Sequence, residues 1–216
     1  MAMTGCLGRA RKGLWIAMLI ASVLGTAPAS AAELHAGPRI GQPAPDFTGT
    51  DSNGGAVSLS ALRGRTVVLE WSNHQCPFVG KHYRSGNMQS LQRDAARDGV
   101  AWITIVSSAP GTQGFVTAAE ANELTRSRGA APMTVVLDPS GAIGREYGAK
   151  TTPHMFVIDP RGTLIYMGAI DDRPTTDVAD IAGARNYVKL ALAAVAAGTP
   201  LTDTVTQPYG CSVKYR

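Results

Sequence analysis

Short apolar segments alternate with helix-forming segments along most of the chain. The β-branched, apolar stretches 66–71, 100–106 and 133–137 predict strands, and the first has the composition of a central strand buried on both faces. Between and after them, residues 77–97, which Gly86 can interrupt, 117–128 and 140–147 predict helices. This alternation predicts an α/β fold in which helices flank a central mixed sheet.

Two hairpins add antiparallel strands to this pattern. Near the start, residues 41–48 and 57–60 flank the Gly-rich turn 51–55, which predicts an N-terminal hairpin extension. Later, residues 155–158 and 164–167 flank a turn that contains Pro and Gly, and these residue types favour a second hairpin.

The last part of the chain predicts one long helix followed by a coil. Residues 177–197 are rich in alanine, and four apolar residues fall on roughly one helical face: Ile181, Val188, Leu192 and Val195. We therefore expect one globular domain over residues 33–198 and a flexible C-terminal tail, residues 199–216, which carries Cys211.

The first 32 residues have the pattern of a secretory signal peptide. A basic segment ending at Lys12 precedes the apolar run 14–24 and the small-residue cleavage site 29–31. This predicts a periplasmic or secreted protein, with an uncleaved anchor or a misassigned start as the alternatives. No apolar run reaches the roughly 18 residues of a membrane-spanning helix, so an integral membrane protein is not expected.

Removal of the signal changes the charge and the cysteine count. The composition is that of a globular protein, with 44% hydrophobic and 17% charged residues. Of the 20 basic residues, 3 precede the apolar run, which leaves 17 against 16 acidic residues and no basic stripe for nucleic acid. Cys6 is lost as well, and Cys76 and Cys211 remain in an oxidising compartment, where they form a disulfide, perform redox chemistry, or both.

Cys76 stands directly before a proline at the predicted start of a helix. Pro77 suits the first helical position because the amide hydrogen that it lacks has no partner there. Cys76 is then at the N-cap, where free backbone N–H groups and the helix dipole favour a thiolate. This predicts a nucleophile; an inert buried cysteine is the alternative.

The segment Val67–Pro77 resembles the active-site strand, loop and helix start of the thioredoxin fold. Its Cys-Pro step is similar to the peroxidatic site of peroxiredoxin-like redoxins of the alkyl hydroperoxide reductase/thiol-specific antioxidant family, and the resemblance extends over about residues 40–197. It implies a peroxide or disulfide substrate, an external thiol reductant and no cofactor. Cys76 matches the first cysteine of a thioredoxin C-x-x-C, and Val79 occupies the place of the second.

Residues 151–153, Thr-Thr-Pro, resemble the cis-proline loop of the thioredoxin fold. The resemblance implies that Pro153 follows a cis peptide bond and lies beside the nucleophile. It also implies that the backbone of Thr152 is presented to the substrate and that the loop keeps metals away from the cysteine.

Two departures from typical peroxiredoxins disfavour fast peroxide reduction. Asn73 replaces their hydroxyl residue three positions before the cysteine, and the loop at Thr152 and Pro153 replaces the arginine before their later strand. Arg84 or Arg145 could supply a guanidinium from elsewhere, with solvated surface residues as the alternative.

Three histidines and a tryptophan are expected near Cys76. A cationic imidazole at His74, His82 or His154 would lower the pKa of the thiol and could deliver a proton; ordinary loop and helix histidines are the alternative. Trp71 is expected to pack in the core beside the site, or to contact the substrate.

Cys211 lies six positions from the C-terminus, on a tail that can reach Cys76. It is interpreted as a resolving thiol that attacks oxidised Cys76, with a permanent disulfide staple and an unpaired or intermolecular thiol left open. Asp171 and Asp172 follow the second hairpin and either line the same cleft or cap the turn.

The sequence therefore predicts an exported thiol oxidoreductase, either a thiol peroxidase or a thiol–disulfide oxidoreductase. Two other classes stay open. One is a copper-binding or copper-delivery protein using Cys76 with His74, His82, His154 or Met155, although Lys81 stands where related chaperones have a second cysteine. The other is a non-catalytic interaction module. The oligomeric state is not encoded in any motif.

Overall fold

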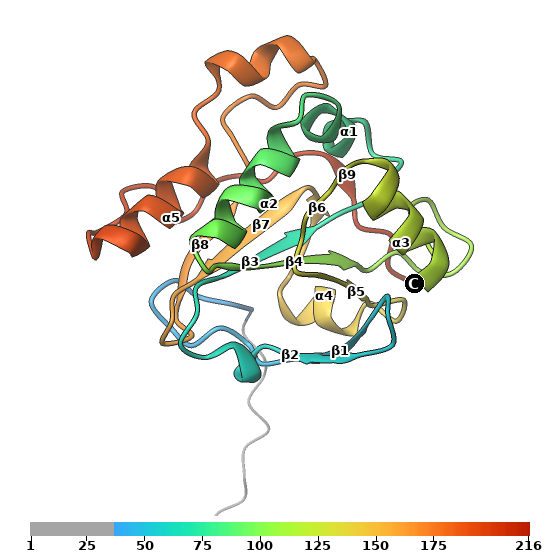
Figure 1. Cartoon of the computed structure of the whole chain (residues 1–216), viewed down its shortest axis with the longest axis horizontal. Coiled ribbons are helices and arrows are strands. Elements are labelled where there is room, and N and C mark those ends of the chain that lie inside the picture. Colours follow the sequence, from blue (N-terminus) through green and yellow to red (C-terminus); the bar gives the residue numbers. More distant parts are fainter. Residues whose placement is uncertain (1–36) are drawn as a thin grey trace, which may run out of the picture. The chain divides into compact units, whose positions relative to one another are not determined.

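The computed structural model describes residues 37–216, and the predicted signal peptide lies outside them. Within this range a seven-stranded mixed sheet has the strand order β2-β1-β5-β4-β3-β7-β8 (Figure 1). The predicted α/β fold with a mixed sheet between helices is confirmed. The strands of this sheet are β1 (Thr48–Asp51), β2 (Ala56–Ser58), β3 (Val67–Trp71), β4 (Ala101–Val106), β5 (Thr134–Leu137), β7 (His154–Ile158) and β8 (Leu164–Gly168).

Strand β3 is central and fully buried, as its apolar composition predicts. It runs parallel to β4 and antiparallel to β7. Successive side chains point to opposite faces, so Leu69 joins one core cluster, with Tyr147 and Phe156, while Val68 joins the other, with Met88. Figure 1 shows helix α4 (Ala142–Glu146) on one face of the sheet and helices α2 (Asn87–Arg97) and α5 (Tyr187–Ala197) on the other.

The N-terminal hairpin forms, but its strands are shorter than the sequence indicates. β1 begins at Thr48 rather than at residue 41, because Pro43 lacks an amide hydrogen for the ladder and makes only an isolated bridge to Thr163. The carboxylate of Asp51 accepts the amide hydrogens of Asn53 and Gly55 and so closes the turn. The second predicted hairpin, formed by β7 and β8, is confirmed.

The helix that follows Cys76 is interrupted at the predicted glycine. α1 (Pro77–Arg84) ends just before Gly86, whose φ of +75° is in the left-handed region, and α2 begins at the next residue. Helix α3 (Ala118–Ser127) starts at a capping box in which Thr117 and Glu120 exchange hydrogen bonds.

The single helix predicted over residues 177–197 is wrong. A 3₁₀ helix, η2 (Val178–Gly183), comes first, and α5 begins only at Tyr187. The physical reason is Asn186, whose side-chain oxygen accepts the amide hydrogen of Lys189 and makes it an N-cap in extended conformation. The amide of Tyr187, the first residue of α5, donates to the carbonyl of Ile170, which fixes the start of this helix to the segment that follows β8.

The C-terminal tail was expected to be a flexible coil, and its end is instead a strand. β9 (Cys211–Ser212) pairs antiparallel with β6 (Thr151–Thr152), the two residues before Pro153. The tail, red in Figure 1, therefore returns to the loop beside the predicted nucleophile.

None of the helices described between residues 37 and 216 combines the length and apolar character needed to cross a membrane.

Candidate active site

Cys76 is the N-cap of α1, where the sequence places it. Its backbone is extended, with φ −77° and ψ 122°, and Pro77 occupies the first helical turn. The residue is 1% exposed, so the sulfur lies under other parts of the chain. The position combines a helix N-terminus with low solvent access.

The cis-proline loop lies directly against this sulfur. The Thr152–Pro153 peptide bond is cis, as the resemblance implies. As a thiol, Cys76 donates a hydrogen bond to the carbonyl oxygen of Thr152 at 3.1 Å. The structure thus brings Cys76, Thr152 and Pro153 together from α1 and from the start of β7.

Cys211 completes the site from the tail. In the β6–β9 pair it lies opposite Thr152, and its backbone N–H donates to the sulfur of Cys76 at 3.4 Å. The Thr152 hydroxyl donates to the carbonyl oxygen of Cys211. Both cysteines are free thiols in this structure. The tail therefore places a second thiol beside the first and covers it.

The two thiols have opposite pKa shifts. Burial raises the pKa of Cys76, but hydrogen bonds from the Cys211 side chain, from the amides of Val79 and Cys211 and from Thr152 outweigh it, and the net pKa is lowered. Burial, the hydrogen bond to Cys76 and the charge of Cys76 together raise the pKa of Cys211 to about 11. Of the two thiols, Cys76 therefore loses its proton more readily.

One side of the tail is anchored on a buried polar cluster formed by Lys81, His82 and Asp171. The hydroxyl of Tyr209 donates to the carboxylate of Asp171 and lies 3.3 Å from Nε2 of His82. Lys81 is fully buried, with Nζ 3.8 Å from the same carboxylate. The ring of Tyr209 packs edge-on against Phe78. Asp171 therefore binds the tail as well as capping its own turn, and it does not contact Cys76.

The other side of the tail is anchored near α4. The hydroxyl of Tyr215 donates to the carbonyl of Ala149 at 2.8 Å, and the guanidinium of Arg145 stacks on the Tyr215 ring at 4.9 Å. The amide of Val213 donates to the carbonyl of Lys150. The guanidinium of Arg145 therefore contacts the tail at Tyr215. Arg84, the other arginine considered for the site, is an exposed residue of α1.

The surroundings of the three histidines favour ordinary loop and helix histidines over a cationic imidazole beside Cys76. Burial lowers the pKa of His154 to about 3, and the charge of Lys150 adds to this effect. Burial lowers the pKa of His82 to about 3 as well, helped by the charge of Lys81. The pKa of His74 is lowered by burial and by Arg128. All three imidazoles are neutral at pH 7 and supply no positive charge to the thiolate.

Asn73 and Trp71 contact the loop before Cys76 and the core, respectively. The side-chain oxygen of Asn73 accepts the amide hydrogen of Gln75 at 2.8 Å, which shapes the loop before Cys76. Trp71 is fully buried between Tyr147 and Phe156, and its indole N–H donates to Ser107. Trp71 is thus a core residue in this conformation.

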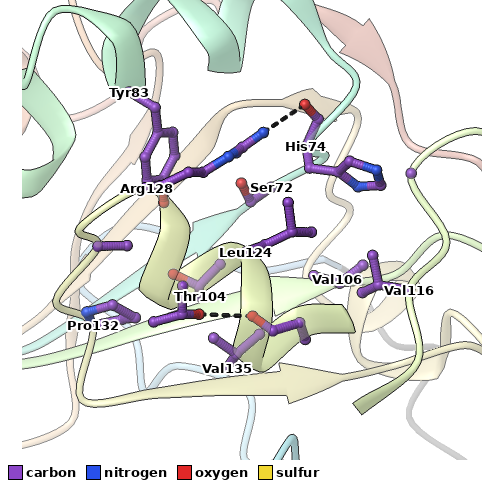
Figure 2. Close-up of a pocket in the computed structure, with 14 residues that line it drawn as sticks. Ser72, His74, Tyr83, Thr104, Val106, Val116, Leu124, Arg128, Pro132 and Val135 are labelled. Carbon is purple, nitrogen blue, oxygen red and sulfur yellow. Dashed lines mark hydrogen bonds between the residues drawn. The ribbon is translucent and has the colours of Figure 1, made fainter. Parts of the chain in front are cut away.

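A pocket lies between α3 and the strands β4 and β5, on the His74 side of the loop before Cys76 (Figure 2). The guanidinium of Arg128 donates to the carbonyl of His74 at 2.8 Å and lies over the Tyr83 ring, so it closes one side. Cys76 is not one of the lining residues, which are Ser72, His74, Tyr83, Thr104, Val106, Gly114, Val116, Ala121, Leu124, Thr125, Arg128, Ala130, Pro132 and Val135.

Sequence reasoning missed two features of the site region. Glu70, fully buried beneath the pocket, accepts hydrogen bonds from four side chains: Tyr83, Gln92, Trp102 and Thr104. Tyr209 anchors the tail. A lone Glu in an apolar strand is a signal that could have been used, because such a charge requires buried partners. Nothing in the sequence near Tyr209 points to Asp171.

Across residues 37–216, no three or more His, Cys, Asp and Glu side chains come together in a group that could hold a metal ion. The copper-binding alternative gains no support from the arrangement of these donors.

Comparisons with known proteins agree with this geometry. Residues 40–167, more than half of the chain, match the AhpC/TSA family. The chain belongs to the AhpC/TSA family. Membership supports a thiol oxidoreductase in general, with thiols or disulfides as redox partners, and leaves the specific reaction undetermined. No curated protein matches the sequence significantly.

Two solved structures of similar size share the fold of this AhpC/TSA family member. A hypothetical protein from Sinorhizobium meliloti 1021 is 24% identical, with a TM-score of 0.69 over 82% of this chain and 95% of that one. An uncharacterized conserved protein from Geobacillus kaustophilus is 23% identical, with a TM-score of 0.69 over 82% of this chain and 93% of that one. At these identities the likeness concerns the fold alone, and it supports the predicted thioredoxin-like architecture.

Proposed function

We propose that this protein is an exported thiol–disulfide oxidoreductase in which Cys76 is the nucleophile and Cys211 of the same chain is the resolving thiol. The observation that carries the proposal is the 3.4 Å approach of the Cys211 amide to the Cys76 sulfur, with Cys211 opposite Thr152 in the β6–β9 pair. Export is inferred from the signal-like N-terminus, and the expected compartment is the periplasm or the exterior.

The reaction has two exchange steps. The Cys76 thiolate attacks one sulfur of a substrate disulfide, forms a mixed disulfide and expels the other sulfur as a thiolate. Cys211 then loses its proton, attacks the Cys76 sulfur and releases the second substrate thiolate. The substrate is reduced and Cys76–Cys211 becomes a disulfide, which an external thiol reductant reopens.

The pKa values of the pair suit this order. Cys76 reacts first because its pKa is lowered while that of Cys211 is raised, so a larger fraction of Cys76 is thiolate. Once Cys76 is in a mixed disulfide, its negative charge is gone, and one cause of the raised pKa of Cys211 disappears with it. The second thiol is therefore activated after the first has reacted.

Peroxide reduction is the less favoured reaction for this site. The histidines around Cys76 are neutral, Arg145 is engaged by the tail, and the Asn73 side chain turns to the Gln75 amide. Arg145 and Asn73 are thus engaged elsewhere and do not supply the groups with which typical peroxiredoxins activate a peroxide.

The test is an exchange assay on the full chain carrying Cys6→Ser, which leaves Cys76 and Cys211 as its only thiols. The reduced protein is mixed with oxidised glutathione or with hydrogen peroxide, free thiols are alkylated, and the intact mass is measured over time. With the disulfide we expect a loss of about 2 Da, a glutathione adduct that persists in Cys211→Ser, and no reaction in Cys76→Ser. Fast oxidation by peroxide with no exchange would identify a thiol peroxidase instead, and inertness to both would favour a non-catalytic module.

A further inference from the structure

Apolar side chains form most of the wall of the pocket between α3 and the strands β4 and β5. Val106 and Val135 come from the strands and Leu124 from the helix, and Figure 2 shows their side chains around the same space. The cavity has a volume of about 50 Å³. Because one water molecule needs roughly 10–15 Å³, there is room for a small organic molecule with a short apolar chain.

Arg128 places a positive charge at one side of this pocket. Its guanidinium donates one N–H to the carbonyl of His74, at 2.8 Å, and lies over the Tyr83 ring. None of the ion pairs between the described residues includes Arg128. A guanidinium has several N–H donors, and two of them together match the two oxygens of a carboxylate. The remaining donors of Arg128 can therefore bind an anion beside the apolar cavity.

His74 supplies a second polar atom to the same pocket. Its Nδ1 is buried and has no hydrogen-bond partner among residues 37–216. A neutral imidazole can carry its hydrogen on either ring nitrogen, so Nδ1 can donate to an acceptor. Buried polar atoms without a partner are uncommon in folded proteins, and a bound carboxylate would satisfy this one.

Two acidic residues near the pocket are engaged elsewhere. The charge of Glu120 acts on His74, but its carboxylate accepts hydrogen bonds from the backbone and the hydroxyl of Thr117. Glu70, beneath the pocket, is surrounded by donors, and burial raises its pKa, which lessens its negative charge. Neither carboxylate forms an ion pair with Arg128, so its guanidinium is left to an anion from outside the chain.

We propose that this pocket binds a small monocarboxylate. The carboxylate lies on Arg128 and on Nδ1 of His74, and the short apolar chain lies between α3 and β5. An amide or alcohol of the same size lacks the charge that Arg128 matches, and a dicarboxylate would bury its second charge among apolar side chains. The site does not depend on the proposed thiol chemistry, because Cys76 does not line the pocket.

Butyrate is the probe for this site, and butyramide is its uncharged counterpart of the same shape. Each is titrated into the full-length protein with isotopically labelled methyl groups, and NMR spectra follow the methyl signals of Leu124 and Val135. A ligand of about six non-hydrogen atoms buries little surface, so we expect butyrate to shift these signals with a Kd of about 1 mM. Butyramide should bind at least about tenfold more weakly.

Three variants test the two polar contacts. Arg128→Gln removes the charge but keeps an N–H donor for the His74 carbonyl, and His74→Phe removes Nδ1 but keeps an aromatic ring. Arg126→Gln is the matched control: it makes the same change of net charge on the same helix, at an exposed residue that pairs with Glu123. We expect the Kd of butyrate to rise at least about tenfold in Arg128→Gln and about fivefold in His74→Phe, and to keep the parent's value in the control.

The absence of saturable shifts with butyrate would refute the pocket as a binding site. Equal affinities for butyrate and butyramide, or for the parent and a folded Arg128→Gln, would show that the carboxylate is not recognised. If Arg128→Gln does not fold, His74→Phe and the butyramide comparison decide, and an unchanged Kd in either would overturn the proposal. None of these titrations involves thiol exchange, so the proposed function can fail while this site stands.

Discussion

Cys211 keeps its proton while Cys76 loses its own more readily, because the Cys211 thiol stabilises the Cys76 thiolate and the two pKa values move in opposite directions. The relationship is mutual: the thiol of one residue stabilises the thiolate of the other. The nucleophilicity of Cys76 therefore depends on a residue that is 135 positions away in the sequence.

Removal of the Cys211 side chain should raise the pKa of Cys76. In Cys211→Ala the largest of the lowering hydrogen bonds is lost, whereas Cys211→Ser retains a hydroxyl donor. We expect the alkylation rate of Cys76 to rise with pH through a higher midpoint in Cys211→Ala than in Cys211→Ser. The ultraviolet absorbance of the thiolate gives an independent midpoint, and identical midpoints in the two variants would contradict the pairing.

Gly210→Ala should displace β9 without unfolding the core. The φ of +128° is unfavourable for alanine, and the added Cβ would overlap the Thr152 carbonyl. We expect Cys76 to be alkylated faster and the Cys76–Cys211 disulfide to form more slowly. Gly183→Ala is the matched control, since its Cβ meets no atom within 4 Å. If both variants keep parental rates, the close approach at Gly210 has no role in covering the sulfur.

Loss of the Glu70 carboxylate should destabilise the fold strongly. Burial raises the pKa of Glu70, and the hydrogen bonds from Trp102 and its neighbours oppose this. Glu70→Leu removes the acceptor shared by four side-chain donors, among them the buried indole N–H of Trp102, which costs roughly 3 kcal/mol or more of unfolding free energy. Glu70→Gln keeps one acceptor oxygen and should lose less. Urea unfolding measures both, and equal losses would mean that packing rather than hydrogen bonding dominates.

Stability should fall as the pH decreases below about 6.5, because His82 and His154 are neutral in the folded protein. Both have pKa values of about 3 when folded and about 6.5 when unfolded, so the unfolded chain binds more protons between these values. Each histidine then contributes up to about 1.4 kcal/mol per pH unit. Urea unfolding of the parent and of His154→Gln at several pH values gives the slope of the unfolding free energy against pH. In the variant this slope should be smaller by the contribution of about one proton.

The strands and most helices could be predicted because their signals are local. Apolar β-branched runs, Gly86, and the step from Cys76 to Pro77 each act within a few residues. The cis bond at Pro153 was predicted only through the resemblance, since most bonds before proline are trans. Asn186 is a residue type that favours the N-cap, so the start of α5 could have been predicted, but the alanine-rich sequence on both sides suggested one continuous helix.

The rest of the site depends on contacts between distant parts of the chain. β9 has two residues and no apolar alternation, so only its partner at Thr151–Thr152 makes it a strand. The charge of the histidines near Cys76 could not be predicted from the sequence, because sequence proximity says nothing about burial. Tyr209 and Asp171 meet 38 positions apart, a pairing that no local pattern encodes.

The separation of β9 from Cys76 along the chain has a consequence for biosynthesis. Cys76 is made 135 positions before Cys211, so the thiol leaves the ribosome, or passes an export channel, well before the strand that covers its sulfur. Until β9 follows, the thiol is uncovered and unpaired, and it is more open to oxidants and stray disulfides. The order of synthesis makes the arrival of β9 the event that protects the nucleophile.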